Sequence, residues 1–145
     1  MSRFAGLAVK AEATYRMEIQ NPFTGQPVRE ANPPEGQEPR VAYLDLLSND
    51  STVARAHDRA INDKRLKNNR RKVTMEELEA EETDKLAKLC RGWLLFGLDG
   101  DAIPEPFSEA AARELLGMPD FLWLRQQAQA AVADLGNYRS EQSKS

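Results

Sequence analysis

The sequence predicts an α+β fold that is mainly helical, with a short N-terminal β-hairpin or small sheet packed on three to four helices. Alternating residues in "YRMEIQ" near the start predict a strand, and later capping signals predict helices. The chain has 145 residues, 41% of them hydrophobic, which is enough for one modest core. We therefore expect a flexible arm over residues 1–14, one α+β domain over 15–139 and a disordered tail over 140–145.

The first structured part is predicted to be β-rich. Tyr15, Met17 and Ile19 alternate with polar residues, as in a strand with one buried face. The segment "NPFTGQP" favours a turn, after which a short strand around Val28 would complete a hairpin. "REANPPEGQEP" predicts a surface loop, and "RVAYLDLL" another strand. Two or three short strands are only marginally stable on their own, so we expect these strands to pack against helices.

The first predicted helix is charged and thinly apolar. Its caps lie in "SNDS", at Ser48 or Ser51, and it runs to about Asn69. The expected apolar stripe is Val53, Ala56, Ala60, Ile61 and Leu66. The basic residues of this region are Arg55, Arg59, Lys64, Arg65, Lys67, Arg70, Arg71 and Lys72. They outnumber Asp58 and Asp63, so the helix is basic. Because its apolar stripe is thin, much of the helix should be solvated.

A second helix is predicted from Thr74, because "TMEE" places Glu77 in a capping box. Its charges run from acidic to basic along the helix, and two pairs at four-residue spacing are expected, Glu81 with Lys85 and Asp84 with Lys88. Its apolar face is expected to extend as far as Phe96, through Leu78, Leu86, Leu89, Trp93 and Phe96. Cys90, the only cysteine, lies within this stretch and is interpreted as a small core residue rather than a reactive or metal-bound thiol.

Two shorter helices are predicted in the last third. After the loop "GLDGDAIPEPF", Ser108 caps a helix "EAAARELL" that ends at Gly117. Asp120 is expected to cap the last helix, which ends near Gly136 and has the apolar positions Phe121, Leu124, Ala128, Val132 and Leu135. Phe121 should lie in the core. Trp123 points about 100° away from Leu124 around the helix axis. Its role has two interpretations, a core residue or a surface anchor for a partner.

The residues do not favour an enzyme. His57, the only histidine, has no evident partner in the sequence, and one cysteine with one histidine cannot form a clustered zinc site. The "DGD" at 99–101 is interpreted as a turn rather than a calcium loop, and no phosphate-binding loop is present. No cofactor is therefore expected. No run approaches the roughly 18 apolar residues of a membrane span, so we expect a cytoplasmic protein with no membrane partner.

The basic run between residues 55 and 72 raises the possibility of nucleic-acid binding, because lysine and arginine can neutralise phosphates. The next segment is strongly acidic, however, and the net charge of the chain is −3. The two runs could face each other across a helix pair or face a protein partner. Nucleic acid is therefore the less favoured partner.

Several short motifs together resemble those of tail assembly chaperones of long-tailed bacteriophages. They are "NPFTGQPV" at 21–28, Gly92 with Trp93, Asp99 with Gly100, "PF" at 106–107, "PDFLW" at 119–123 and "DLGNY" at 134–138. The resemblance covers roughly residues 15–139 and is densest from Thr74 onward. A long proline-rich insertion and the N-terminal arm depart from the family pattern.

The resemblance implies a non-enzymatic protein of the host cytoplasm. It would bind the tape measure protein, keep it soluble, help to recruit tail tube subunits and be absent from the finished virion. Self-association is possible. The partner-binding candidates are Trp93, Phe96, Phe107 and Trp123, unless these residues only pack on each other and the charged helix or the arm binds instead. A virion structural protein, such as a tail completion or connector protein, and a small nucleic-acid-binding regulator remain as alternatives.

Overall fold

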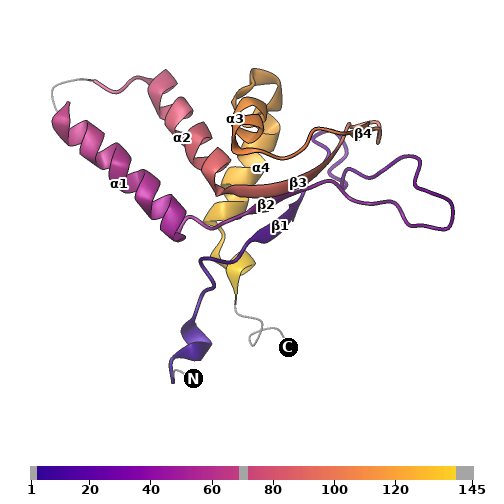
Figure 1. Cartoon of the computed structure of the whole chain (residues 1–145), viewed down its shortest axis with the longest axis horizontal. Helices are drawn as coiled ribbons and strands as arrows, with labels where there is room; N and C mark the ends of the chain where they lie inside the picture. Colours follow the sequence, from indigo (N-terminus) through magenta and orange to yellow (C-terminus); the bar gives the residue numbers. More distant parts are fainter. Residues whose placement is uncertain (1–2, 69–71, 140–145) are drawn as a thin grey trace.

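A computed structural model describes residues 3–68 and 72–139, which fold around one antiparallel sheet (Figure 1). The strands are β1 (Tyr15–Glu18), β2 (Tyr43–Leu46), β3 (Cys90–Phe96) and β4 (Ala102–Ile103), in that spatial order. The described α-helices are α1 (Thr52–Lys67), α2 (Met75–Leu89), α3 (Glu109–Gly117) and α4 (Leu122–Ala133). Short 3-10 helices lie at Ala5–Leu7, Pro119–Phe121 and Leu135–Tyr138. The predicted α+β class is confirmed.

The sheet is larger than the short N-terminal hairpin that was one of the two expectations, because β1 and β2 belong to a four-stranded sheet. β1 pairs with β2, and β2 pairs on its other side with β3 from the middle of the chain. Val28 is buried but lies outside the named strands. It still joins two neighbouring segments, because its N–H donates to Ile19 O and its carbonyl accepts from Ala42 N, both at 2.9 Å. The residues around it contribute only isolated bridges. The predicted alternation holds, because Met17 and Ile19 are buried while their polar neighbours are more exposed.

The helix α1 is capped as expected but docks differently from the prediction. Ser51 Oγ accepts from Ala54 N at 3.2 Å, which confirms the N-cap. The side chains that the helix buries are Ala54 and His57, whereas Leu66 is 74% exposed. The predicted stripe was therefore wrong for Ala56, Ala60 and Leu66, which are all exposed. The reason is that α1 lies at one edge of the molecule beside α2 (Figure 1). The predicted end at Asn69 and the basic residues at 70 and 71 lie outside the described residues.

The helix α2 begins as predicted but ends early. Thr74 Oγ1 accepts from Glu77 N at 3.1 Å, yet the helix stops at Leu89 and the segment Cys90–Phe96 is the strand β3. A short apolar run fits either period, and here pairing with β2 and β4 decides in favour of a strand. Cys90 is therefore a buried strand residue rather than a helical one.

The ion pairs of α2 confirm one of the two expected pairs. Asp84 binds Lys88 at 3.1 Å, as predicted. Glu81 and Lys85, however, bind residues of α1, respectively Arg65 and Asp58. The charged residues of α2 thus pair with several helices, because α1, α3 and α4 all offer opposite charges to it.

The C-terminal helices correct two boundaries. Ser108 Oγ accepts from Ala111 N at 3.0 Å, which confirms the cap of α3. Asp120 does not cap α4, since it lies inside the 3-10 helix Pro119–Phe121 and the N-cap position is Phe121 without a side-chain hydrogen bond. The last helix ends at Ala133 and a further 3-10 helix follows, which leaves Leu135 46% exposed. The predicted tail at 140–145 and residues 1–2 of the arm lie outside the described residues.

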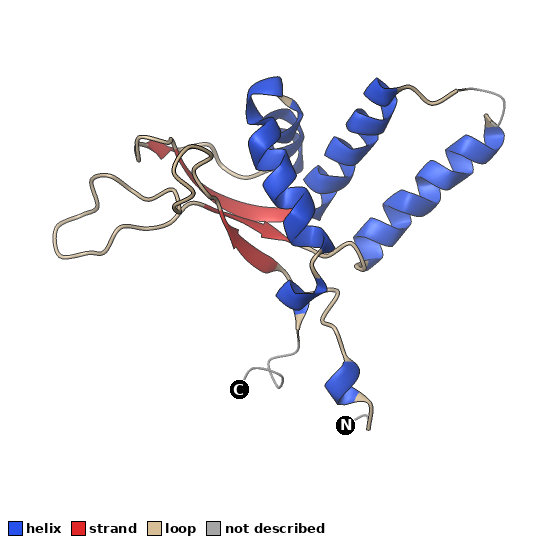
Figure 2. Cartoon of the chain, turned by 180° about the vertical axis from the view of Figure 1, so that it is seen from behind, coloured by secondary structure: helices blue, strands red, loops and turns tan. Residues whose placement is uncertain are grey.

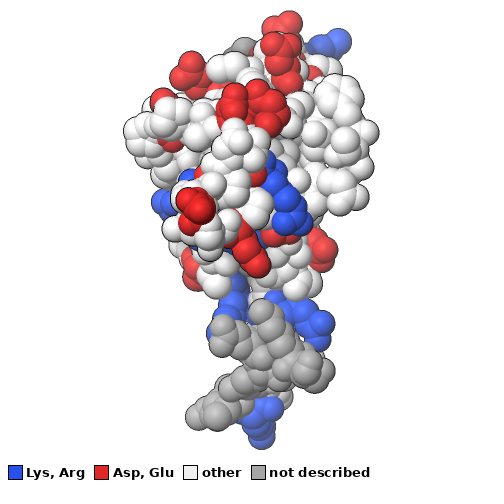
Figure 3. Space-filling view, turned by 90° about the vertical axis from the view of Figure 1, so that its right-hand side faces the viewer, with Lys and Arg blue, Asp and Glu red and all other residues white. Residues whose placement is uncertain are grey.

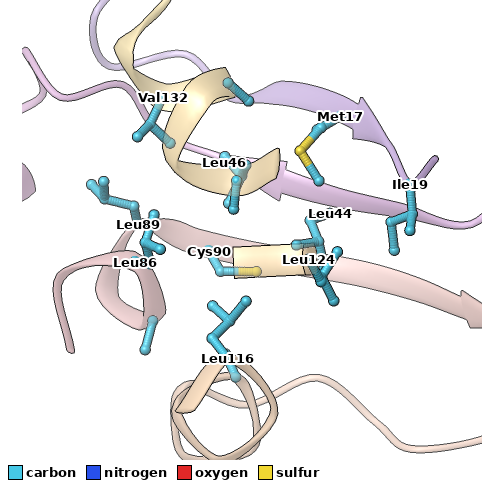
Figure 4. Close-up of a cluster of buried hydrophobic side chains, with 14 of the residues drawn as sticks. Met17, Ile19, Leu44, Leu46, Leu86, Leu89, Cys90, Leu116, Leu124 and Val132 are labelled. Carbon is cyan, nitrogen blue, oxygen red and sulfur yellow. The ribbon is translucent and has the colours of Figure 1, made fainter. Parts of the chain in front are cut away.

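The core lies between the sheet and the helices on one of its sides (Figure 2). Side chains of β1 and β2 meet leucines from the helices, as the close-up of Met17, Leu44, Leu86, Leu116 and Leu124 shows (Figure 4). Tyr138 closes this core at the C-terminal end, because its Oη donates to Leu46 O at 3.1 Å. The N-terminal arm is attached there as well, since Lys10 N donates to Tyr138 O at 2.8 Å.

Candidate partner-binding groove

An apolar groove of about 390 Å³ lies between the β3–β4 hairpin and the segment formed by α3 and α4. Two antiparallel strands form one wall, and the 3-10 turn at Pro119–Phe121 lets α3 and α4 form the other. Its main apolar walls are Trp93, Leu95, Leu115, Met118, Phe121 and Trp123. The groove is thus built by segments that are distant in sequence.

Trp93 is held in place at one wall. Its Nε1 donates to Glu105 O at 2.9 Å, and its ring meets Phe107 edge to face, with 5.3 Å between centroids and an angle of 87° between the planes. Aromatic pairs favour this arrangement, which adds about 0.5–1.5 kcal/mol beyond area burial. The segment after β4 is therefore packed onto the indole, and the indole keeps a fixed position beside the groove.

The structure brings the predicted contact candidates together. Trp93, Phe96 and Trp123 line the groove, and Phe107 packs on Trp93 behind it. Phe96 is only 7% exposed and has the Arg40 guanidinium 5.6 Å from its ring, so it supports the wall. Trp123 is half-buried, packs against the core and also faces the groove, so it has both environments that the sequence left open. Partner contact by these side chains stays a prediction.

Three rim residues were missed by the sequence reasoning. Leu98, Ile103 and Met118 line the groove and are 45%, 45% and 37% exposed. Leu98 and Ile103 fall in a segment predicted to be only a loop, which in fact turns tightly at Gly100 and returns as β4. Large apolar residues on either side of "DGD" were the available signal, since a solvated loop has no need of them.

The charge at the groove is acidic. Its charged lining residues are Glu105 and Glu114, and none of the residues described as lining it is lysine or arginine. On the side of the molecule that carries the β3–β4 hairpin, acidic and basic side chains are both scattered over a largely uncharged surface (Figure 3), so the acidic character is local to the groove lining. A partner with an apolar face and flanking cations would fit this groove better than an acidic one.

A second polar cluster joins α1 to the rest of the protein. His57, for which the sequence suggested no partner, is 6% exposed, and its Nδ1 lies 3.3 Å from Lys88 Nζ and 3.7 Å from Asp84 Oδ2. Asp84 also accepts from Arg113 of α3, at 2.8 Å. Burial, together with the charge of Lys88, lowers the pKa of His57 below 6.5 despite the opposing effect of Asp84. The imidazole is therefore neutral at pH 7 and packs as a helix contact.

The basic run of α1 and the acidic run of α2 do face each other, and each helix contributes both cations and carboxylates to the ion pairs between them. Arg65 of α1 binds Glu81, while Asp58 of α1 binds Lys85 at 3.1 Å. Part of the charge that suggested nucleic-acid binding is thus used between the two helices. Nucleic acid stays the less favoured partner in the prediction.

Cys90 is placed as a core residue. It is 2% exposed, and burial raises the pKa of its thiol to about 11, so the thiolate needed for nucleophilic or metal chemistry is disfavoured. Among residues 3–68 and 72–139, no cluster of three or more His, Cys, Asp or Glu is arranged to hold a metal ion. The turn at 99–101 is confirmed, with Gly100 at φ +90°.

Comparison with known proteins adds no assignment. The chain matches no protein-family profile, and neither the curated proteins nor the solved structures contain a significant match. Within the described part of the chain, no helix has both the length and the apolar character of a membrane span.

Proposed function

We propose that this protein is a tail assembly chaperone of a long-tailed bacteriophage. It binds the tape measure protein in the host cytoplasm, keeps that long helical polypeptide soluble, helps to recruit tail tube subunits, and is absent from the finished virion. It acts without catalysis or a cofactor. The single observation that carries the proposal is the half-open apolar groove, which joins the sequence resemblance to a surface able to accept part of a client.

The groove favours a helical client over a small molecule. Its volume falls in the range of small-ligand pockets, about 300–1,000 Å³, but such pockets enclose about 70–90% of the surface of the ligand. Here the walls are mainly apolar, and the groove is open along a rim where Leu98, Ile103 and Met118 are exposed. This combination suits an amphipathic helix whose apolar residues enter an apolar groove.

The acidic rim defines the client further. Glu105 and Glu114 would attract lysine or arginine beside the apolar stripe of the client and would repel acidic helices. Because exposed charge pairs contribute little affinity, these glutamates select the partner while the apolar contacts hold it. Such binding is reversible, as a chaperone that leaves the assembled tail requires.

The test is an affinity purification from phage-producing cells at near-physiological salt. The wild-type protein is compared with Met118→Lys and Ile103→Lys, which place a cation on the groove rim. Leu66→Lys makes the same kind of change at a 74% exposed site on α1, outside the groove lining, and serves as the control. Co-purifying proteins are identified by mass spectrometry, and purified particles are analysed beside them.

The proposal expects the wild type and the Leu66→Lys control to enrich the tape measure or tail tube protein, and the two groove variants to lose it. The protein itself should be missing from purified particles. Its presence in particles would instead indicate a structural component of the virion. Recovery of nucleic acid alone, with no tail protein, would indicate the regulator alternative.

A further inference from the structure

The turn "NPFTGQP" at 21–27 has no role in the groove as described so far, and its central aromatic residue is unusually exposed. Phe23 is 86% exposed, the largest exposure of any phenylalanine that the structure describes. Single exposed apolar residues are common on protein surfaces and need no explanation. The local structure of this turn and its position, however, point to a function.

The turn is rigid because its own hydrogen bonds hold it closed. Asn21 Oδ1 accepts from Phe23 N at 2.8 Å and from Thr24 N at 3.3 Å. Across the turn, Asn21 N donates to Gln26 O and Gly25 N donates to Asn21 O, each at 2.8 Å. Gly25 has φ +71°, a conformation that glycine adopts without strain. Phe23 is therefore presented on a fixed backbone.

The base of the turn is attached to the same helix that forms the groove. Gln127 of α4 makes two hydrogen bonds to the Gln20 backbone, accepting from its N–H at 3.0 Å and donating to its carbonyl at 2.8 Å. One helical turn earlier on α4, Trp123 lines the groove. The side-chain amide thus fixes the turn relative to a groove wall.

The turn also begins and ends at the groove. Ile19 and Val28, the residues that enter and leave this segment, both line it. Phe23 follows Ile19 by only four positions, so its backbone lies within about 14 Å of a groove wall. A helix of about 18 residues spans about 27 Å, which is enough to fill the groove and reach the turn.

We propose that Phe23 is a preorganised anchor that extends the groove and contacts the same amphipathic helix, beyond the end of the apolar cavity. This inference rests on the proposed helix-binding function of the groove. The segment 20–27 carries no charge, whereas Glu105 and Glu114 lie on the groove itself. The client is therefore a helix with an apolar stripe along its length, lysine or arginine over the groove, and an apolar residue over Phe23. A rigid aromatic side chain gives such an anchor large contact area at little entropic cost.

The experiment uses the full chain and a fluorescein-labelled 18-residue helical peptide made of leucine and lysine, with leucines on one face. Binding is measured by fluorescence anisotropy. Both tryptophans of the chain line the groove, so their emission reports occupation of the groove by this tryptophan-free peptide. The variants are Phe23→Ala, Phe23→Tyr and Asn21→Ala, with Met118→Lys for the groove. Leu7→Ala, at an 84% exposed site on the N-terminal arm, is the control.

We expect Phe23→Ala to raise the Kd about tenfold, as truncation of an interface anchor does, while Phe23→Tyr and Leu7→Ala leave it within about twofold. Asn21→Ala should weaken binding less, through a looser turn. The peptide is also shortened from each end in turn. A shortened peptide that no longer reaches the turn should bind wild type and Phe23→Ala equally well, while still changing the tryptophan emission. Thermal unfolding of each variant is measured as a check on folding, and the Phe23 variants should unfold like the wild type because this side chain is 86% exposed.

The outcomes separate the two proposals. If Met118→Lys weakens binding and Phe23→Ala does not, the anchor is refuted and the groove remains. If the wild type fails to bind the peptide, or binds it without a change in tryptophan emission, the groove and the anchor are both refuted. A leucine and glutamate peptide that binds as tightly as the lysine peptide would refute the stated charge of the client.

Discussion

Protonation of His57 should destabilise the fold, and this is the most sharply testable consequence of the α1–α2 contact. The imidazole is 6% exposed and lies 3.3 Å from Lys88 Nζ. Desolvation and then Lys88 lower its pKa from 6.5, while Asp84 and Asp58 oppose this and Lys85 adds to it. The folded state therefore binds the proton less readily than the unfolded state.

The sign follows from proton linkage. A histidine whose folded pKa is below its unfolded pKa contributes full stability above the unfolded value and loses it as the pH falls through 6.5 toward the folded value. One proton gives a slope of at most about 1.4 kcal/mol per pH unit in the free energy of unfolding. Because His57 is the only histidine, no other imidazole contributes to this window.

The assay is urea unfolding at several pH values from 8 to 5, for the wild type and for His57→Gln. We expect the free energy of unfolding of the wild type to fall with acidification from about pH 6.5, while the curve of the variant stays nearly flat there. The imidazole pKa is read directly by NMR. Parallel curves for the two proteins, or a wild type that gains stability on acidification, would refute the buried, neutral histidine.

Three further predictions concern the groove hairpin and the core. Gly100→Ala should cost at least about 2 kcal/mol of unfolding free energy in urea, because φ is +90° and a Cβ would lie 2.6 Å from Ala31 N; an unchanged stability would contradict this contact. Leu116→Ala should cost about 2–5 kcal/mol, since Leu116 is 1% exposed, and a loss below about 1 kcal/mol would show that α3 does not pack as described. Cys90 should react with a maleimide at pH 8 far more slowly than a free thiol and at full speed in urea, because burial raises its pKa to about 11; rapid labelling of the native protein would show an open core.

Local signals in the sequence predicted local structure well. Ser51, Thr74 and Ser108 cap their helices as expected, because an N-cap depends only on a side chain and the backbone N–H three residues later. The alternation of Met17 and Ile19 predicted a half-buried strand for the same reason. The sequence could not show that the run after Leu89 is a strand, because its partner β2, which includes Leu44, is distant in the chain.

The candidate site was only partly predictable. The aromatic residues Trp93 and Trp123 were singled out by composition and resemblance, and they do share the groove. Leu98 and Met118 were missed, since their importance depends on how the hairpin folds back on α3 and α4. His57 had no partner in the sequence because Asp84 and Lys88 belong to the neighbouring helix.

By itself the sequence determined the α+β class, the starts of α1, α2 and α3, and the sharp turns at 21–26 and 99–101, since each depends on a few neighbouring residues and their backbone preferences. Only the tertiary structure decided that the apolar run after Leu89 is a central strand, which helix faces are buried and where the apolar groove opens. Those features arise from contacts between segments far apart in the chain, which local propensities do not encode. The attachment of the turn at 21–27 to α4 is of this second kind, because it depends on the hydrogen bonds between Gln20 and Gln127, 107 residues apart.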